Sequence, residues 1–179
     1  MAAMKFATTR EFLNLSGHSL RRHHLPRAKR CLELLSDEQI WWRPNPASNS
    51  AGNLALHLAG NVRQWIVSGL GGAPDTRHRD REFSEQGPVP RDELIRALTS
   101  SVNHACRVLR GLSTRDLART YTIQKMHVRG LNAVLHVVEH FAFHTGQIIF
   151  ITKQQLNEDL DFTRLPGDRK APLRKLPVL

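Results

Sequence analysis

The sequence predicts an all-α protein built as a four-helix bundle. Four segments place apolar residues at the spacing of a helix, and residues that favour a helix terminus flank them. Only one short stretch, RTYTIQ, reads as extended. The length of 179 residues fits one domain with a sizeable core. In a bundle of this kind, facing helices can build a metal site inside the core.

The first predicted helix runs from Thr8 to about Leu35. Thr8 and Glu11 have the spacing of a capping box, in which two side chains satisfy backbone N–H groups at the start of a helix. Pro26 has no N–H group and should kink or split the helix. The turn that follows, SDEQIWWRPNPASNS, leads into the second helix.

The second predicted helix begins at Ser48, Asn49 or Ser50, each of which can cap it, and ends at Gly69. A long connection rich in glycine, proline and charge then runs to Val89. Connections of this length are often functional. The segment RHRDREF within it therefore either borders a site or forms a plain surface loop.

Pro90 starts the third predicted helix, and Asp92 and Glu93 favour its first turn. The fourth runs from Gly130 to about Gln154 and contains the most apolar stretch of the chain. The apolar stripe of the third helix comprises Leu94, Leu98, Val102, Ala105 and Leu109.

Three histidines lie four residues apart on the fourth helix: His136, His140 and His144. Residues at this spacing share one face of a helix, and two neutral imidazoles so placed can bind one transition metal. His140 and His144 are the favoured pair, with Gln147 one turn further on. His136 could replace His144, but one ion cannot use all three comfortably. The alternative is a row of core histidines bonded to backbone or amide groups.

His57 is the candidate third ligand, on the second helix. Asn53, Asn61 and Gln64 lie within about 40° of it on a helical wheel. A solvent face normally carries Lys and Glu, whereas this stripe carries only amides and one imidazole. The pattern predicts a polar pocket between helices, or else a neutral exposed face or a hydrogen-bonded core histidine.

The segment HVVEH also matches the H-x-x-E-H pattern of inverted zinc peptidases, with Glu139 as the general base. Such enzymes need an acidic third ligand downstream. Glu158, Asp159 and Asp161 lie in an unpromising polar segment, so this interpretation ranks low.

The net charge of +10 is concentrated in two segments. Residues 16–31 hold five Arg or Lys and no acid, and residues 164–179 hold five against one acid. This distribution indicates either a surface for nucleic acid or another polyanion, or a solvated helix face plus a basic tail. The second is favoured, because no aromatic residues interleave with the charges. We expect residues 1–163 to form the bundle and residues 164–179 to contribute little to it.

Cysteine usage and hydropathy point to a cytoplasmic protein. Cys31 and Cys106 show no metal or redox spacing and are expected to be core thiols. The first residues have no apolar region typical of a signal peptide. The apolar stretch from Gly130 to Ile151 is long enough to cross a bilayer, but it contains Glu139 and three histidines, so no membrane association is expected.

Two motifs, NLALHLAGNVRQWI and later HVVEHFAFHTGQI, resemble those of the DinB/YfiT-like superfamily of metalloenzymes. LSDEQIWWRPNPASNSAGN and the EF of RDREF resemble one branch of unknown function. The resemblance covers roughly residues 10–162. One departure is Val128-Arg129-Gly130 before the last helix, where relatives often carry Thr or Ser.

The resemblance implies a four-helix bundle that holds one divalent metal, such as zinc or nickel, through His57, His140 and His144. It also implies a small-molecule substrate and a homodimer. Some relatives are transferases or isomerases that use a low-molecular-weight thiol, so a thiol-dependent transferase is the leading expectation. The alternatives are a metal-dependent hydrolase and a non-catalytic, metal-stabilised module with a basic surface for nucleic acid. Asn53, Asn61 and Gln147 are the candidates for orienting a ligand or bound water.

Overall fold

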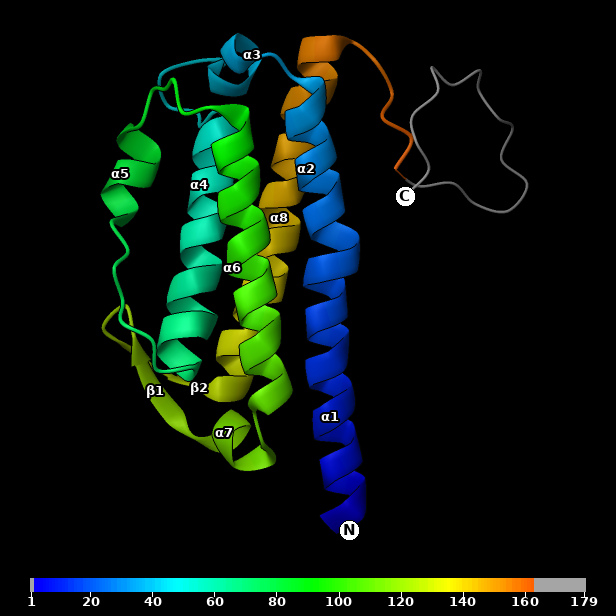
Figure 1. The fold of residues 1–179 in the computed structure, drawn as a ribbon, viewed down its shortest axis with the longest axis vertical. Coiled ribbons are helices and arrows are strands. Elements are labelled where there is room, and N and C mark those ends of the chain that lie inside the picture. Colours follow the sequence, from blue (N-terminus) through cyan, green and yellow to red (C-terminus); the bar gives the residue numbers. More distant parts are fainter. Residues whose placement is uncertain (1, 163–179) are drawn as a thin grey trace, which may run out of the picture.

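Four long helical rods lie side by side in the computed structural model, which describes residues 2–162 (Figure 1). A short β-hairpin and short helices close the ends and one flank of this bundle. The predicted all-α, four-helix architecture is therefore confirmed. The rods are α1 (Ala2–His18) continued by a π-helical segment (Ser19–His24) and α2 (Leu25–Leu34); α4 (Ala51–Val62) continued by a π-helical segment (Arg63–Leu70); α6 (Arg91–Gly111); and α8 (Gly130–Leu156).

The first rod differs from its prediction at its start, where Thr8 was expected to cap it, and at Pro26. It begins at Ala2, so Thr8 lies inside α1 and the predicted capping box at Thr8 is wrong. Pro26 does not break the rod. The chain widens into the π-helical segment Ser19–His24 before α2 begins. A proline cannot donate a hydrogen bond to the preceding turn, and the wider turn lets the rod continue through it.

The second rod begins with a capping box. Ser50 Oγ accepts a hydrogen bond from Asn53 N at 3.1 Å, and Ser50 N donates to Asn53 Oδ1 at 3.1 Å. Ser50 is therefore the N-cap among the three residues that the sequence offered. Ten of the twelve residues of α4 are buried, because α6, α8 and the 75–85 segment all pack against it.

The third and fourth rods follow the predicted boundaries closely. The α6 helix starts after Pro90, and its five predicted stripe residues are all buried. The α8 helix starts at Gly130 and ends at Leu156, where Asn157 adopts a left-handed conformation with φ 52°. Within the described residues, α8 is the one helix long and apolar enough to span a membrane. One side of it packs against α2 and α4.

Several short elements lie in segments predicted as turns or loops: α3 (Asp37–Trp41), α5 (Arg79–Ser84), α7 (Thr114–Ala118), β1 (Thr120–Ile123) and β2 (Met126–Arg129). The strands pair antiparallel, with Thr120 opposite Arg129. RTYTIQ is thus one arm of a hairpin. The α5 helix packs against α4 and brings the long connection onto the second rod (Figure 1).

The core runs along the length of the bundle between the four rods. Phe141 of α8 and Leu58 and Ile66 of the second rod are among its fully buried large side chains. Cys31 and Cys106 are buried free thiols, as expected. The predicted basic tail, residues 164–179, lies outside the described residues.

Candidate metal centre

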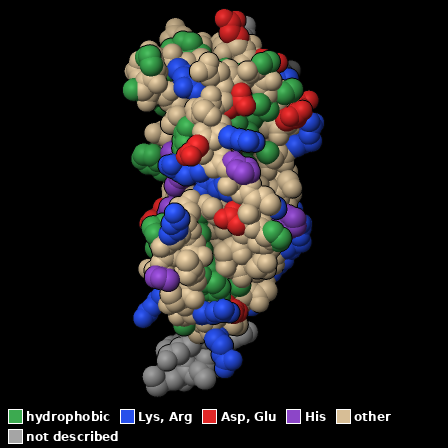
Figure 2. All heavy atoms as spheres, turned by 90° about the vertical axis from the view of Figure 1, so that its left-hand side faces the viewer, with side chains coloured by type: hydrophobic (Ala, Val, Ile, Leu, Met, Phe, Trp, Pro, Cys, Tyr) green, Lys and Arg blue, Asp and Glu red, His purple; other side chains and the backbone are tan. Residues whose placement is uncertain are grey.

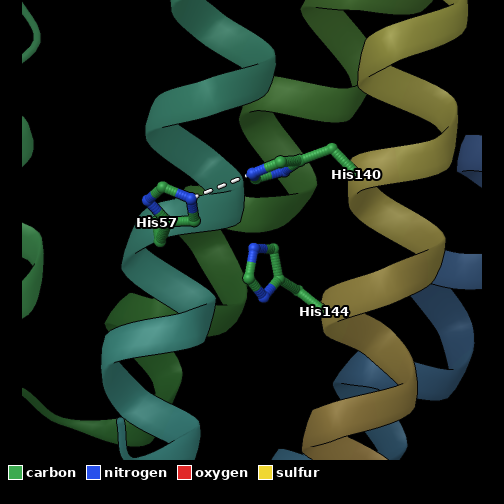
Figure 3. Close-up of side chains that lie close together, drawn as sticks. All are labelled: His57, His140 and His144. Atoms are coloured by element: carbon green, nitrogen blue, oxygen red, sulfur yellow. Dashed lines mark hydrogen bonds between the residues drawn. The ribbon is translucent and has the colours of Figure 1, made fainter. Parts of the chain in front are cut away.

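Three histidines from two helices meet between α4 and α8 (Figure 3). His57 projects from α4, and His140 and His144 project from successive turns of α8. One ring nitrogen from each lies within 4.8 Å of the others, so the group could hold a metal ion. The i, i+4 spacing on α8 sets two of these positions, and the packing of α4 on α8 sets the third.

The closest approach is between His57 and His140, whose Nε2 atoms are 3.0 Å apart. Two nitrogens that each lie about 2.1 Å from a tetrahedral metal are about 3.4 Å from each other. The observed separation is close to that value. His144 turns one ring nitrogen toward the space between the other two rings (Figure 3).

Glu82 of α5 fixes the orientation of the His57 ring. Its Oε2 lies 2.9 Å from His57 Nδ1, and both side chains are buried. A carboxylate can only accept here, so Nδ1 carries the proton and the lone pair of His57 Nε2 faces His140 and His144. Carboxylate partners of this kind orient metal-binding histidines in proteins.

Arg77 holds the Glu82 carboxylate ionised. Its Nε and Nη2 atoms donate to Glu82 Oε1 and Oε2 at 2.7 and 2.8 Å. Burial alone would raise the pKa of Glu82, but the hydrogen bonds from Arg77 and His57 and their charges lower it overall. Arg77 Nη2 also lies 3.1 Å from His57 Nδ1. Both nitrogens bear protons, so this is a contact and not a hydrogen bond.

Gln147 plays the corresponding part for His144. Its Oε1 lies 2.6 Å from His144 Nδ1 and can only accept, which leaves His144 Nε2 unprotonated. His140 differs, since its Nδ1 is buried with no hydrogen-bond partner among the described residues. His57 and His144 therefore already present an unprotonated Nε2 that could bind a metal. At His140, the proton must move from Nε2 to Nδ1.

The environment keeps the α8 histidines neutral, which is the form that binds metal. Burial lowers the pKa of His140 to about 3, and the nearby charges of His144, His57, His136 and Arg77 act in the same direction. Burial also lowers the pKa of His144, although the hydrogen bond to Gln147 opposes this. Protons therefore do not compete for these nitrogens near neutral pH.

A glycine on α4 makes room for the carboxylate. A Cβ atom added at Gly60 would collide with Glu82 Oε1 and lie 2.9 Å from Arg77 Nε. Gly60 is three residues beyond His57, so it belongs to the adjoining turn of the helix. Close approach of the Glu82–Arg77 pair to α4 requires the missing side chain.

Asn53, Asn61 and Gln147, the residues predicted to orient a ligand or bound water, have different surroundings. Asn53 is fully buried, and its amide is occupied: Oδ1 accepts from Ser50 and Arg43, and Nδ2 donates to the Glu82 and Glu85 carbonyls. It ties the C-terminal part of α5, which carries Glu82, to α4. Gln147 contacts His144 directly. The role of each in orienting a ligand stays a prediction.

Asn61 and His136 form a pair one turn away from the three histidines. Asn61 Nδ2 lies 3.4 Å from His136 Nε2, and the His136 ring packs on Trp65 at 4.1 Å between centroids. His136 is outside the group of three. Glu139 is exposed, so the geometry gives no support to the H-x-x-E-H interpretation.

The RHRDREF segment, expected either to border a site or to form a plain surface loop, contains both Arg77 and Glu82, but sequence reasoning assigned no role to either residue. Glu82 lies 25 positions from His57. One signal could have indicated such a role: Glu82 is an acidic residue within a basic segment, where it can pair with a neighbouring arginine. Helical periodicity gives no information about such a loop.

Comparison with known proteins gives one family and a set of similar folds. Residues 7–169 match the DUF1572 family, described as a protein of unknown function. The chain belongs to this family. No match to a curated protein was found.

The similar solved structures include a conserved protein from Enterococcus faecalis, with 17% identity, a TM-score of 0.69, and coverage of 81% of this chain and 97% of that one. DinB-like proteins from Bacillus subtilis (18%, 0.61, 82% and 95%) and Bacillus cereus (17%, 0.58, 75% and 87%) are also similar. The DUF1572 chain therefore has a DinB-like fold, and the DinB/YfiT-like resemblance is confirmed.

Proposed function

We propose that this DUF1572 protein is a divalent-metal-dependent enzyme whose metal is held by His57, His140 and His144. The observation that carries the proposal is the chain of contacts Arg77–Glu82–His57, which directs a lone pair into the space shared by the three rings. A purely structural cluster of core histidines has no need of an ionised, buried carboxylate behind one ring. Neutral imidazoles suit zinc, nickel and other transition metals.

Three protein ligands leave a coordination position open, as in catalytic sites. The metal would supply a positive charge that lowers the pKa of a thiol or water bound at that position. Glu82 would hold the His57 ring, Gln147 would hold the His144 ring, and Arg77 would keep Glu82 ionised. Asn61 is near enough to His136 to fix that ring beside the site.

The favoured reaction is transfer of a low-molecular-weight thiol to a small electrophile. The S–H bond breaks and its proton goes to solvent, a bond forms from sulfur to the electrophilic carbon, and the leaving group departs with its electron pair. Metal-dependent hydrolysis is the alternative, with water in place of the thiol. The open position and the uncharged ligand set are compatible with both reactions.

Metal analysis of the purified protein, followed by cobalt substitution and thiol addition, tests this proposal. We expect about one ion per chain, and a sulfur-to-cobalt charge-transfer band with release of a proton. His140→Ala should lose the metal, whereas His104→Ala, an exposed histidine on α6, should keep it. Tight metal binding without response to any thiol would favour hydrolysis or a structural metal.

A metal-stabilised module for nucleic acid is the competing proposal. Figure 2 shows basic side chains scattered among acidic and histidine side chains on the face that includes α5, which does not favour it. Retention on a polyanion column that falls steeply with salt would support it. The homodimer and the cytoplasmic location stay predictions, and sedimentation measurements check the first of these.

A further inference from the structure

A groove of about 530 Å³ lies beside the three histidines, between the connection that precedes α4 and the C-terminal half of α8. Its size is that of a small-molecule site. Two of its lining residues contact His144: Gln147 through the 2.6 Å hydrogen bond, and Phe143 by ring packing at 5.1 Å between centroids. On the α4 side it is lined by Leu54, one turn before His57. The groove therefore adjoins the candidate metal centre at His144.

None of the eleven residues that line the groove is charged. This is notable in a chain whose net charge is +10. Apolar side chains such as Leu54, Phe143 and Phe150 alternate with amides such as Gln147 and Gln154. Phe143 and Phe150 are 66% and 62% exposed, so the apolar surface is open to a ligand. Such a lining stabilises an uncharged group and would leave an ionised one without a partner.

Gly146 provides open space on the α8 wall of the groove. A Cβ atom added there would meet no atom within 4 Å, in contrast to Gly60 on α4. The space is therefore available to a ligand, and a larger side chain at position 146 would occupy it without displacing the protein.

We propose that this groove binds the uncharged, largely apolar arm of the molecule whose reactive end binds at the three histidines. The inference rests on the proposed function for the location of that reactive end. It assigns the substrate class: a neutral molecule with an alkyl or aryl arm, able to accept or donate a hydrogen bond to an amide. The uncharged lining disfavours an ionised arm.

A series of neutral alkyl thiols, from ethanethiol to hexanethiol, tests this on the cobalt-substituted protein. Because each buried methylene contributes a constant hydrophobic increment, affinity should rise about two- to fourfold per methylene. Gly146→Leu should flatten the series, because the leucine side chain would fill the space that the longer chains occupy. Gly111→Leu, at a glycine with equally open surroundings on α6, should keep the slope. A flat series in the unmodified protein would overturn the inference.

A matched pair of thiols distinguishes the effect of the groove lining on binding from the effect of the protein's net charge. 6-Mercaptohexan-1-ol should bind several-fold more tightly than 6-mercaptohexanoate, although the positive net charge favours the anion at long range. Tighter binding of the carboxylate would contradict the assigned substrate class.

A fluorescence measurement on the metal-free protein tests ligand binding in the groove independently of the proposed metal chemistry. The neutral dye Nile red should gain fluorescence on the metal-free protein, and Gly146→Leu, but not Gly111→Leu, should remove most of this gain. If no thiol gives a charge-transfer band but the dye result holds, the groove stands and the thiol chemistry does not. If Gly146→Leu instead alters the sedimentation coefficient, the groove is a contact between copies and the inference is wrong.

Discussion

The chemistry of this site depends on which ring nitrogens carry protons. Glu82 accepts from His57 Nδ1 and Gln147 accepts from His144 Nδ1, so both rings present an unprotonated Nε2 to the same space. His140 lacks such a partner among the described residues. Its pKa, lowered to about 3, keeps it neutral but does not select its tautomer. His57 and His144 are thus already in the tautomer that could bind a metal, whereas the tautomer of His140 can still change.

Glu82→Gln should weaken metal binding about 10- to 100-fold, as loss of such partners does. A neutral amide oxygen still accepts from His57 Nδ1, but it no longer raises the basicity of the ring. The control Asp80→Asn removes a similar charge from the exposed face of α5 and should have no effect. Titration with zinc against a competing chelator measures the affinities.

The same substitution leaves Arg77 with an unpaired buried charge, which destabilises the fold. A double variant, Arg77→Gln with Glu82→Gln, should recover most of the thermal stability without recovering the metal affinity. Recovery of both would mean that Glu82 acts on the fold and not on His57.

Cys31 should give the protein a pH-dependent stability at alkaline pH. Burial raises the pKa of its thiol from 9.0 to about 11. The thiol therefore stays protonated in the folded chain when it would ionise in the unfolded one. Its contribution is fully present below about pH 9 and is lost as the pH rises toward about 11. The difference in free energy of unfolding between wild type and Cys31→Ala should shrink between about pH 9 and about pH 11, as measured by urea unfolding. An unchanged difference would contradict this.

At the scale of elements, α4 acts as the scaffold of the site. Its neutral stripe bonds to groups on both sides of His57: Asn53 binds the backbone at Glu82, and Asn61 lies within hydrogen-bond distance of His136. Gln64, further along the same rod, accepts from Arg77 at 2.9 Å. The stripe lacks charge because it faces other parts of the protein and not solvent.

Gly60→Ala tests whether the 75–85 segment must approach α4 this closely. Alanine normally stabilises a helix interior by about 1 kcal/mol relative to glycine. Here we expect the reverse, with weaker metal binding, because the Cβ atom displaces Glu82. Gly146→Ala is the matched control and should raise the melting temperature by a few degrees. Equal gains at both positions would show that the Glu82–Arg77 pair moves aside freely.

Helical periodicity in the sequence predicted the long helices, but it gave no information about the short helices and the loops. The α6 and α8 boundaries and the i, i+4 histidine pair followed from helical spacing. The α3, α5 and α7 helices were missed, because five or six residues carry too little periodicity. The role of Glu82 could not be assigned for a related reason. Its contacts with Arg77 and His57 depend on how a loop folds over a helix, which the local pattern does not encode.

At the scale of the whole molecule, the candidate metal centre joins two rods that are far apart in sequence. His57 and the α8 histidines are 83 or more residues apart along the chain. In the metal-free protein, apolar packing between α4 and α8 holds these rods together. A bound ion would add a link between them that exists only in the folded state, so metal binding and folding stability must be coupled.

A metal that binds only the folded chain should therefore raise its melting temperature. At a free concentration about 100 times the Kd, the added stability is about 2.7 kcal/mol. For a domain of this size that corresponds to about 5–10 °C. His57→Ala should abolish most of the shift, because it removes the ligand from α4 while the pair on α8 remains. His104→Ala should retain it. Scanning calorimetry with zinc, nickel and cobalt measures the shifts and ranks the metals. A shift of the same size in His57→Ala would mean that the ion binds to α8 alone, and the inter-helical site would be wrong.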